Sequence, residues 1–132
     1  MAETTEPRAG EQVDFTPAEV NYLKGQNLAR IATASNNGEV DVAPIGLHFN
    51  GQTFLVVGID LPHSFKYRHI KENGAVAMVV DDLTSVDPWR PRGVKIHGRA
   101  RIRTDSSGRE IIVVTPYRKW SWGLGQGEGT TQ

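Results

Sequence analysis

The sequence predicts a mainly β fold, a six-stranded antiparallel barrel that is closed or half-closed and carries a few short helices. Apolar runs of strand length follow one another along the chain, with hairpin signals between them at Asn36-Asn37-Gly38 and Asn50-Gly51. The segment Val94–Arg103 alternates between apolar and mostly basic residues, as a strand with one buried face does. Only two short segments favour a helix, so hairpin-linked strands closing into a barrel match the pattern best.

The first element is a helix that begins at Pro17, after an N-terminal tail. Met1–Val13 is rich in Glu, Thr, Pro and Gly and has no apolar periodicity, which predicts disorder. Thr16 and Glu19 have the spacing of a capping box, Pro17 suits the first helical position, and Gly25 ends the helix. The folded domain is therefore expected to span residues 14–124, with a second disordered tail at residues 125–132.

Six strands are expected along the rest of the chain. Their ranges are Leu28–Ala34, Val40–Phe49, Gln52–Ile59, Ala75–Val80, Val94–Arg103 and Glu110–Thr115. Pro44 cannot donate a hydrogen bond to a neighbouring strand, which predicts a sheet edge or a bulge at that position. The fourth strand is apolar throughout and is expected to be buried on both faces. Asn50-Gly51 is expected to form a type I′ turn. With no internal repeat and no linker, the 132 residues predict a single domain.

The segment Leu61–Asp82 carries the strongest sign of a ligand. It predicts a short helix capped by His63 or Ser64, followed by a tight Asn73-Gly74 turn and a strand. Lys66 falls within an apolar and aromatic arc of this helix, formed by Phe65, Tyr67, His69 and Ile70. A cation in such surroundings is costly unless it meets an anion, and the helix N-terminal amides favour the same anion. The prediction is a phosphate-bearing ligand at Ser64 and Lys66; the alternative is that Lys66 simply extends to water.

A second candidate site lies in the segment Asp87–Arg92, which is expected to form a rigid loop. Arg90 and Arg92 flank a proline beside Trp89, so the loop is stiff, aromatic and positively charged. This combination suits an anionic ligand that carries a ring. The alternative is that Trp89 only covers one end of the barrel.

Composition excludes several classes of function. The 15 basic and 15 acidic side chains balance, so no overall field directs the protein to nucleic acid or to a membrane surface. There is no cysteine, and the four histidines lack metal-ligand spacing, so neither a disulfide framework nor a metal site is expected. No signal-peptide-like or membrane-spanning apolar run is present, which predicts a cytoplasmic protein. Obvious acid–base or nucleophilic groups are missing too, so a bound cofactor would carry any catalysis.

Five segments in order resemble a known family. They are Arg30–Ala34, Val42–Gly46, Ser64–Arg68, Val76–Val80 and Arg92–Gly98. Together they resemble the pyridoxamine 5′-phosphate oxidase-like flavoproteins, and most of all the actinobacterial deazaflavin-dependent class that uses coenzyme F-420. Residues 81–93 and 120–124 resemble a subgroup that includes a tetracycline-biosynthesis reductase. The resemblance implies a six-stranded split β-barrel of the FMN-binding type and a homodimer with two cofactor sites at its interface.

The resemblance also implies which residues bind the cofactor. The phosphate-binding segment of the family falls on Ser64, Phe65, Lys66 and Tyr67, and the strand beside the flavin ring falls on Ala43, Pro44 and Ile45. Further expected cofactor contacts are Val57, Gly58, Trp89, Arg90, Arg92 and Val94. Phe65 replaces the arginine that is usual in the phosphate-binding segment, so one phosphate contact is missing or is supplied elsewhere, for which Arg90 and Arg92 are the candidates. Two further positions depart from the flavin-using oxidases: Val42 stands where an arginine is common, and Gly93 replaces a glutamine. These two departures favour F-420 over FMN.

The function implied is an F-420-dependent reductase that transfers hydride between the deazaflavin and an unsaturated small molecule. Two alternatives stay open at this point, namely an FMN- or FAD-dependent oxidoreductase of the same family and a non-catalytic F-420 carrier. The sequence identifies neither the substrate nor a proton donor.

Overall fold

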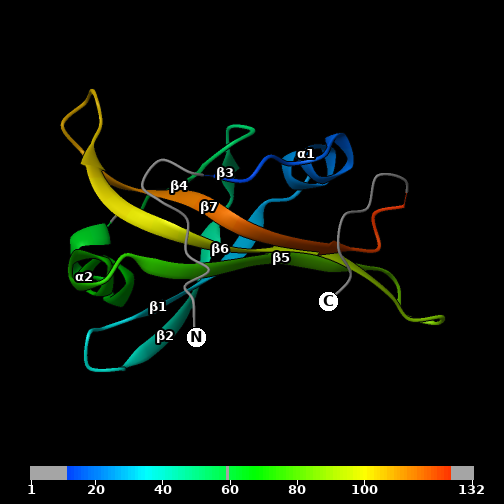
Figure 1. Ribbon diagram of the computed structural model, residues 1–132, viewed down its shortest axis with the longest axis horizontal. Coiled ribbons are helices and arrows are strands. Elements are labelled where there is room, and N and C mark those ends of the chain that lie inside the picture. The colour runs from blue at the N-terminus through cyan, green and yellow to red at the C-terminus, as the bar shows by residue number, and fades with distance from the viewer. Residues whose placement is uncertain (1–11, 59, 126–132) are drawn as a thin grey trace.

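The computed structural model describes residues 12–58 and 60–125, which form one curled antiparallel sheet with two short α-helices (Figure 1). The strand order across the sheet is β2-β1-β5-β6-β7-β4-β3. The helical elements are α1 (Pro17–Lys24), the 3₁₀ turn η1 (Leu61–His63) and α2 (Phe65–Glu72). The strands are β1 (Leu28–Ala34), β2 (Val40–Gly46), β3 (His48–Phe49), β4 (Phe54–Val56), β5 (Ala75–Ser85), β6 (Arg90–Thr104) and β7 (Glu110–Trp122). The mainly β barrel class predicted from the sequence is confirmed.

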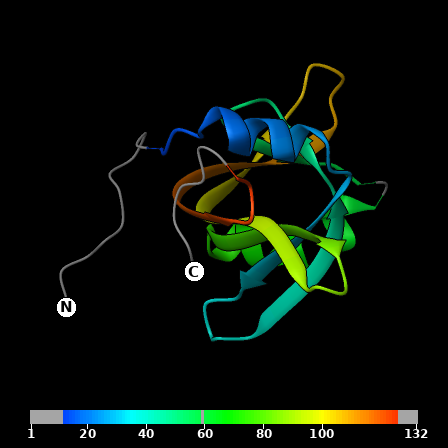
Figure 2. The same ribbon diagram turned by 90° about the vertical axis from the view of Figure 1, so that its right-hand side faces the viewer.

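The sheet closes because its two edges are covalent neighbours. β2 and β3 lie at opposite ends of the strand order, yet only Leu47 separates them in the chain. The Leu47 amide donates to the Asn27 carbonyl at 2.9 Å, which holds this junction beside the start of β1. The sheet must therefore curl until its edges meet, and Figure 2 shows the resulting half-barrel. The expected strand Val40–Phe49 is divided at this junction, and Pro44 lies on an edge strand as predicted.

The inward side chains form one apolar core. Its fully or largely buried members include Ile31, Ile45, Phe54, Val56, Met78, Val94, Ile96, Ile112 and Val114. α2 packs against β1, β2 and β6 at one end of the barrel. The alternation predicted for β6 is confirmed, but β5 is not buried on both faces: Val76, Met78 and Val80 are buried, whereas Ala75, Ala77 and Val79 are only half-buried. The prediction failed because nothing in the described chain covers the outer face of this strand.

Two strands run further than the sequence suggested. Arg90–Arg92 belongs to β6 and pairs with the end of β5, so the expected rigid loop is a tight turn at the tip of a long hairpin. β7 continues through Pro116 to Trp122. Proline has no N–H to donate to a neighbouring strand. On the β4 side of β7 this costs nothing at Pro116, because the pairing of β4 with β7 ends at Val114. The Pro116 carbonyl instead accepts from the Val13 amide at 3.1 Å.

Turn chemistry was only partly predictable. Asn50 does not have positive φ, so Asn50-Gly51 is not a type I′ turn; the Asn50 side-chain oxygen accepts from the Gln52 and Thr53 amides instead. Nor is Asn73-Gly74 a tight turn. Gly74 leads straight into β5, and an added Cβ would lie 2.7 Å from the Ala100 carbonyl oxygen, so close backbone packing requires this glycine. The predicted tails fall almost wholly on residues 1–11 and 126–132, outside the described residues.

Candidate functional site

The first turn of α2 presents unbonded amides at the barrel end. Ser64 is the N-cap: its hydroxyl oxygen accepts from the Tyr67 amide at 3.2 Å, and the hydroxyl donates to the Leu61 carbonyl at 2.7 Å. The Arg68 amide donates to the Ser64 carbonyl. In the described chain, the Phe65 and Lys66 amides have no acceptor, as expected for the first helical positions. They are free to bind an anion.

Lys66 lies on this turn as a partly buried cation. Within residues 12–58 and 60–125, it makes no ion pair, hydrogen bond or ring contact. Tyr67, His69 and Ile70 are buried, but Phe65 is 49 % exposed and stacks under the Arg68 guanidinium at 4.7 Å. Phe65 lies on the predicted arc, with its ring 5.9 Å from that of His69, but it forms the exposed edge of that arc. Lys66 therefore lies beside the buried residues Tyr67, His69 and Ile70, and its ammonium has no counter-ion within the described residues.

Polar contacts fix α2 to the barrel, among them the following three. The Tyr67 hydroxyl donates to Glu110 at 2.7 Å, and this hydrogen bond, together with burial, raises the pKa of Tyr67. His69 Nδ1 lies 2.9 Å from the Thr33 hydroxyl on β1. The Asn36 amide donates to Glu72 at 3.0 Å. These contacts hold the helix start, and hence Lys66, in one position relative to β1 and β7.

Two other groups of expected site residues lie near this helix. On β2, Ile45 is buried and Ala43 is half-buried on the core side, whereas Pro44 is exposed on the edge. β2 is one of the strands that contacts α2. Val57 and Gly58 follow β4 and are exposed. Gly58 lines a cavity of about 440 Å³ together with Leu61, Pro62, Gly108, Arg109 and Glu110, next to the start of α2.

The remaining expected residues lie at the other end of the sheet. Trp89 and Arg90 are exposed at the β5–β6 hairpin tip, while α2 lies beside the start of β5 (Figure 1). β5 is 11 residues long, which corresponds to a separation of roughly 35 Å at about 3.3 Å per residue. Val94 is buried in the core. Within one chain, therefore, Arg90 and Arg92 do not meet Lys66.

Arg92 also has a local partner that the sequence did not reveal. Its guanidinium forms two hydrogen bonds to Asp82, at 2.8 and 3.1 Å, and lies 5.0 Å from the centre of the Tyr22 ring. Tyr22 donates its hydroxyl proton to the same carboxylate at 3.0 Å. The hydrogen bond from Arg92 lowers the pKa of Asp82. The cluster ties α1 to the β5–β6 hairpin.

A buried carboxylate, Glu19, was seen from the sequence only as part of a capping box. The capping box is confirmed, but Glu19 is also fully buried, and its oxygens accept from Lys119 Nζ and Ser121 Oγ, both at 2.7 Å. Burial acts to raise its pKa, but hydrogen bonds from Lys119, the Thr16 amide and Ser121 outweigh it and lower the pKa. Lys119 and Ser121 alternate along β7 and so share one face of it. The expected strand ended at Thr115, before Pro116, so there was no reason in the sequence to place these two residues on a strand.

The described residues offer neither a membrane-spanning helix nor a metal site. No helix there is both long enough and apolar enough to cross a membrane. Across the same ranges, no three His, Asp or Glu side chains gather closely enough to hold a metal ion.

The sequence and the fold are similar to those of known proteins. Residues 15–128 match the family model of pyridoxamine 5′-phosphate oxidase. A 5a,11a-dehydrotetracycline/5a,11a-dehydrooxytetracycline reductase of Streptomyces rimosus is 34% identical over 119 residues, which cover 83% of this chain and 84% of the reductase. A conserved hypothetical protein of Mycobacterium tuberculosis has the same fold, with a TM-score of 0.70 at 16% identity, covering 92% of this chain and 91% of its own. A structure described as an F-420 reductase aligns with a TM-score of 0.56 at 23% identity, covering 70% and 88% of the two chains. The chain belongs to the pyridoxamine 5′-phosphate oxidase family of split β-barrels.

Proposed function

We propose that this protein is a reductase that uses coenzyme F-420 to deliver hydride to an electron-poor double bond of a small molecule. The observation that carries the proposal is Lys66, a partly buried cation without a partner in the described chain, beside two free amides at the start of α2. This donor set fits a cofactor phosphate. The reductase relative from Streptomyces rimosus and the F-420 reductase fold relative support the same activity.

The residues of this chain would bind and orient the cofactor rather than react. Lys66 and the amides of Phe65 and Lys66 would hold the phosphate, and the edge strand at Ala43–Ile45 would border the ring. The deazaflavin, when bound, supplies the hydride. The buried Ile45 side chain anchors this strand to the core, so its backbone would give the ring a fixed wall on one side.

Two positions support F-420 in preference to FMN or FAD. Val42 offers no charge where flavin-using relatives often carry arginine, and Gly93 offers no side chain where they carry glutamine. Titration of the purified protein with F-420, FMN and FAD tests the choice directly. We expect F-420 to bind most tightly and to support reduction of an enone or quinone. Isolation as a stoichiometric FMN complex would show that the protein is a flavin-dependent oxidoreductase instead. Tight F-420 binding without any turnover would show that it is a carrier of the cofactor.

Replacing Lys66 with alanine should weaken F-420 binding about ten- to a hundredfold, because one charge-assisted contact is worth about 1.5–3 kcal/mol. Isothermal titration calorimetry measures the change. Lys71→Ala is the matched control: this exposed lysine lies on the same helix, against the Tyr67 ring rather than the free amides. If both variants bind F-420 equally well, the phosphate does not lie at Lys66.

We further propose a homodimer, because two apolar surfaces are left open in the single chain. Val42 is 66% exposed on the outer side of the edge strand, two residues from the exposed Val40, and the exposed Leu28 lies further along the neighbouring strand β1. The hairpin tip carries a second exposed group, with Trp89 at 66% and Val86 nearby. Exposed apolar areas of this kind mark interaction sites, and a two-fold contact is the commonest way to cover them. Such a contact would let Arg90 of one protomer approach the Lys66 end of its partner.

Val42→Glu should convert the dimer to a monomer at micromolar concentration, because it places a charge within an apolar contact without disturbing the core. Light scattering or sedimentation measures the mass. Asn21→Glu, which adds the same charge on exposed α1, should leave the dimer intact. A wild-type protein that is monomeric at this concentration would remove the dimer from the proposal.

A further inference from the structure

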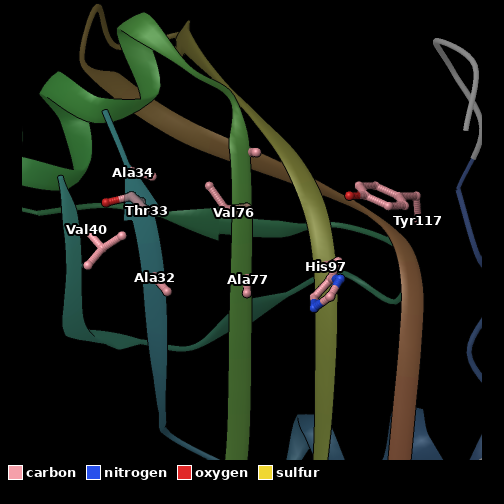
Figure 3. Close-up of a pocket in the computed structure, with 9 residues that line it drawn as sticks. Ala32, Thr33, Ala34, Val40, Val76, Ala77, His97 and Tyr117 are labelled. Atoms are coloured by element: carbon pink, nitrogen blue, oxygen red, sulfur yellow. The ribbon is translucent and has the colours of Figure 1, made fainter. Parts of the chain in front are cut away.

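A shallow pocket of about 310 Å³ lies on the outer face of the sheet, away from the start of α2 (Figure 3). Its floor is made of small side chains on neighbouring strands, with Ala32 of β1 directly opposite Ala77 of β5. Val40 of β2 forms one side, and His97 of β6 and Tyr117 of β7 form the other. Because methyl groups leave the sheet surface almost level, this floor suits a flat, apolar molecule.

The polar groups of this pocket differ between its two sides: the Thr33 hydroxyl on β1 is taken up by His69 Nδ1 at 2.9 Å, whereas the groups on β6 and β7 have no hydrogen-bond partner among the described residues. In the described part of the chain, neither the Tyr117 hydroxyl nor the His97 ring nitrogens make a hydrogen bond. Figure 3 shows the Tyr117 hydroxyl pointing away from β7 toward β6. His97 is half-buried and meets the Trp120 ring edge at 4.7 Å. Burial, with the charges of Lys95 and Arg118, lowers the pKa of His97, so the ring is neutral at pH 7 and donates one N–H.

We propose that this pocket binds a planar, conjugated carbonyl compound, with Tyr117 and His97 donating hydrogen bonds to a carbonyl oxygen. The inference rests on the proposed function, since such a compound would be its hydride acceptor. A hydrogen bond to the carbonyl withdraws electrons from the conjugated double bond and so makes that bond a better acceptor. An apolar floor with few, convergent donors is the usual composition of a small-molecule site.

The test uses the protein without cofactor and a probe that cannot add covalently to side chains, 2,3-dimethyl-1,4-naphthoquinone. Quinones quench tryptophan fluorescence at short range, and Trp120 lies against His97, so binding is followed by quenching and confirmed by equilibrium dialysis. The hydrocarbon 2,3-dimethylnaphthalene has the same shape without the oxygens, and dialysis measures its binding. We expect it to bind about tenfold more weakly than the quinone.

Three variants locate the probe. Ala77→Leu fills the floor and should weaken quinone binding at least about tenfold, a fold-change typical of a lost apolar fit. Tyr117→Phe and His97→Phe each remove one donor and keep a ring, so each should weaken quinone binding about three- to tenfold and leave hydrocarbon binding unchanged. Arg101→Gln, on the same face of β6 but outside the pocket, is the control.

Four results would overturn the pocket assignment. These are no quinone binding by the wild type, equal binding of quinone and hydrocarbon, unchanged binding by Ala77→Leu, and dissociation of dimers on adding quinone, which would make this face a contact between copies. F-420 titration is run separately on the same samples. Quinone binding without F-420 binding would refute the proposed function but leave the pocket standing, and the reverse outcome would refute the pocket alone.

Discussion

Replacing Glu19 with alanine is expected to lower the free energy of unfolding by about 3–5 kcal/mol, as is typical when one partner of a buried ion pair is removed. Glu19 is fully buried, and its two oxygens accept from Lys119, Ser121 and the Thr16 amide. Alanine would leave the largely buried Lys119 ammonium without its anion and would remove the capping box of α1. Urea denaturation at pH 7 measures the loss.

The same carboxylate predicts how stability changes with acid. The pKa of Glu19 in the folded protein lies below its ordinary value of 4.5, so its contribution is complete above that value and is lost as pH falls through the folded pKa. Wild type should therefore lose more stability than Glu19→Ala between pH 6 and pH 3. The double variant Glu19→Leu with Lys119→Met removes both charges and should recover part of the loss at pH 7. A cost below about 1 kcal/mol for Glu19→Ala would contradict a structural role for the pair.

Restoring the family's glutamine at Gly93 is expected to destabilise the protein by about 3 kcal/mol, the upper part of the range for overpacking. An added Cβ would lie 2.6 Å from the Trp122 ring, 2.7 Å from the Val80 carbonyl oxygen and 2.9 Å from Asp81 Cβ. The carbonyl belongs to the paired backbone of β5 and cannot move aside. Gly93→Gln should therefore lower the melting temperature of the protein.

Gly25→Ala is the control for this substitution, because its added Cβ meets nothing nearer than 3.6 Å. Thermal unfolding followed by circular dichroism should show little change for that variant. If Gly93→Gln melts like the wild type, β5 and β7 can move away from Gly93 of β6 more easily than the close contacts indicate.

Local signals in the sequence predicted most of the elements. The capping box at Thr16, the limits of β1 and the alternation along β6 each depend on neighbouring residues, and all three are confirmed. What failed depended on distant strands. Pro116 is tolerated inside β7 because β4 stops short of it, and Gly74 is required because Ala100 of β6 approaches its backbone. Neither fact has a signal within a few residues of the position concerned.

The candidate site divides in the same way. The Ser64 cap was predictable because a helix start is a local motif, and the start of the helix also fixes where Lys66 lies. The distance from Lys66 to Arg90 could not be predicted, because it depends on the length of β5. The ion pair of Arg92 with Asp82 could not be anticipated either, since it required knowing that the two residues are paired across one hairpin.

The single-residue link at Leu47 restricts where this chain can vary in length during evolution. Hairpin ends such as residues 35–39, 86–89 and 105–108 lie outside the curled sheet and can gain or lose residues at little cost. Between Gly46 and His48 the chain passes directly from one sheet edge to the other, so an inserted residue would enlarge the circumference of the barrel and reverse the inward and outward faces of all that follows in β3. Insertions and deletions among homologues should therefore gather at the hairpin ends and avoid this junction.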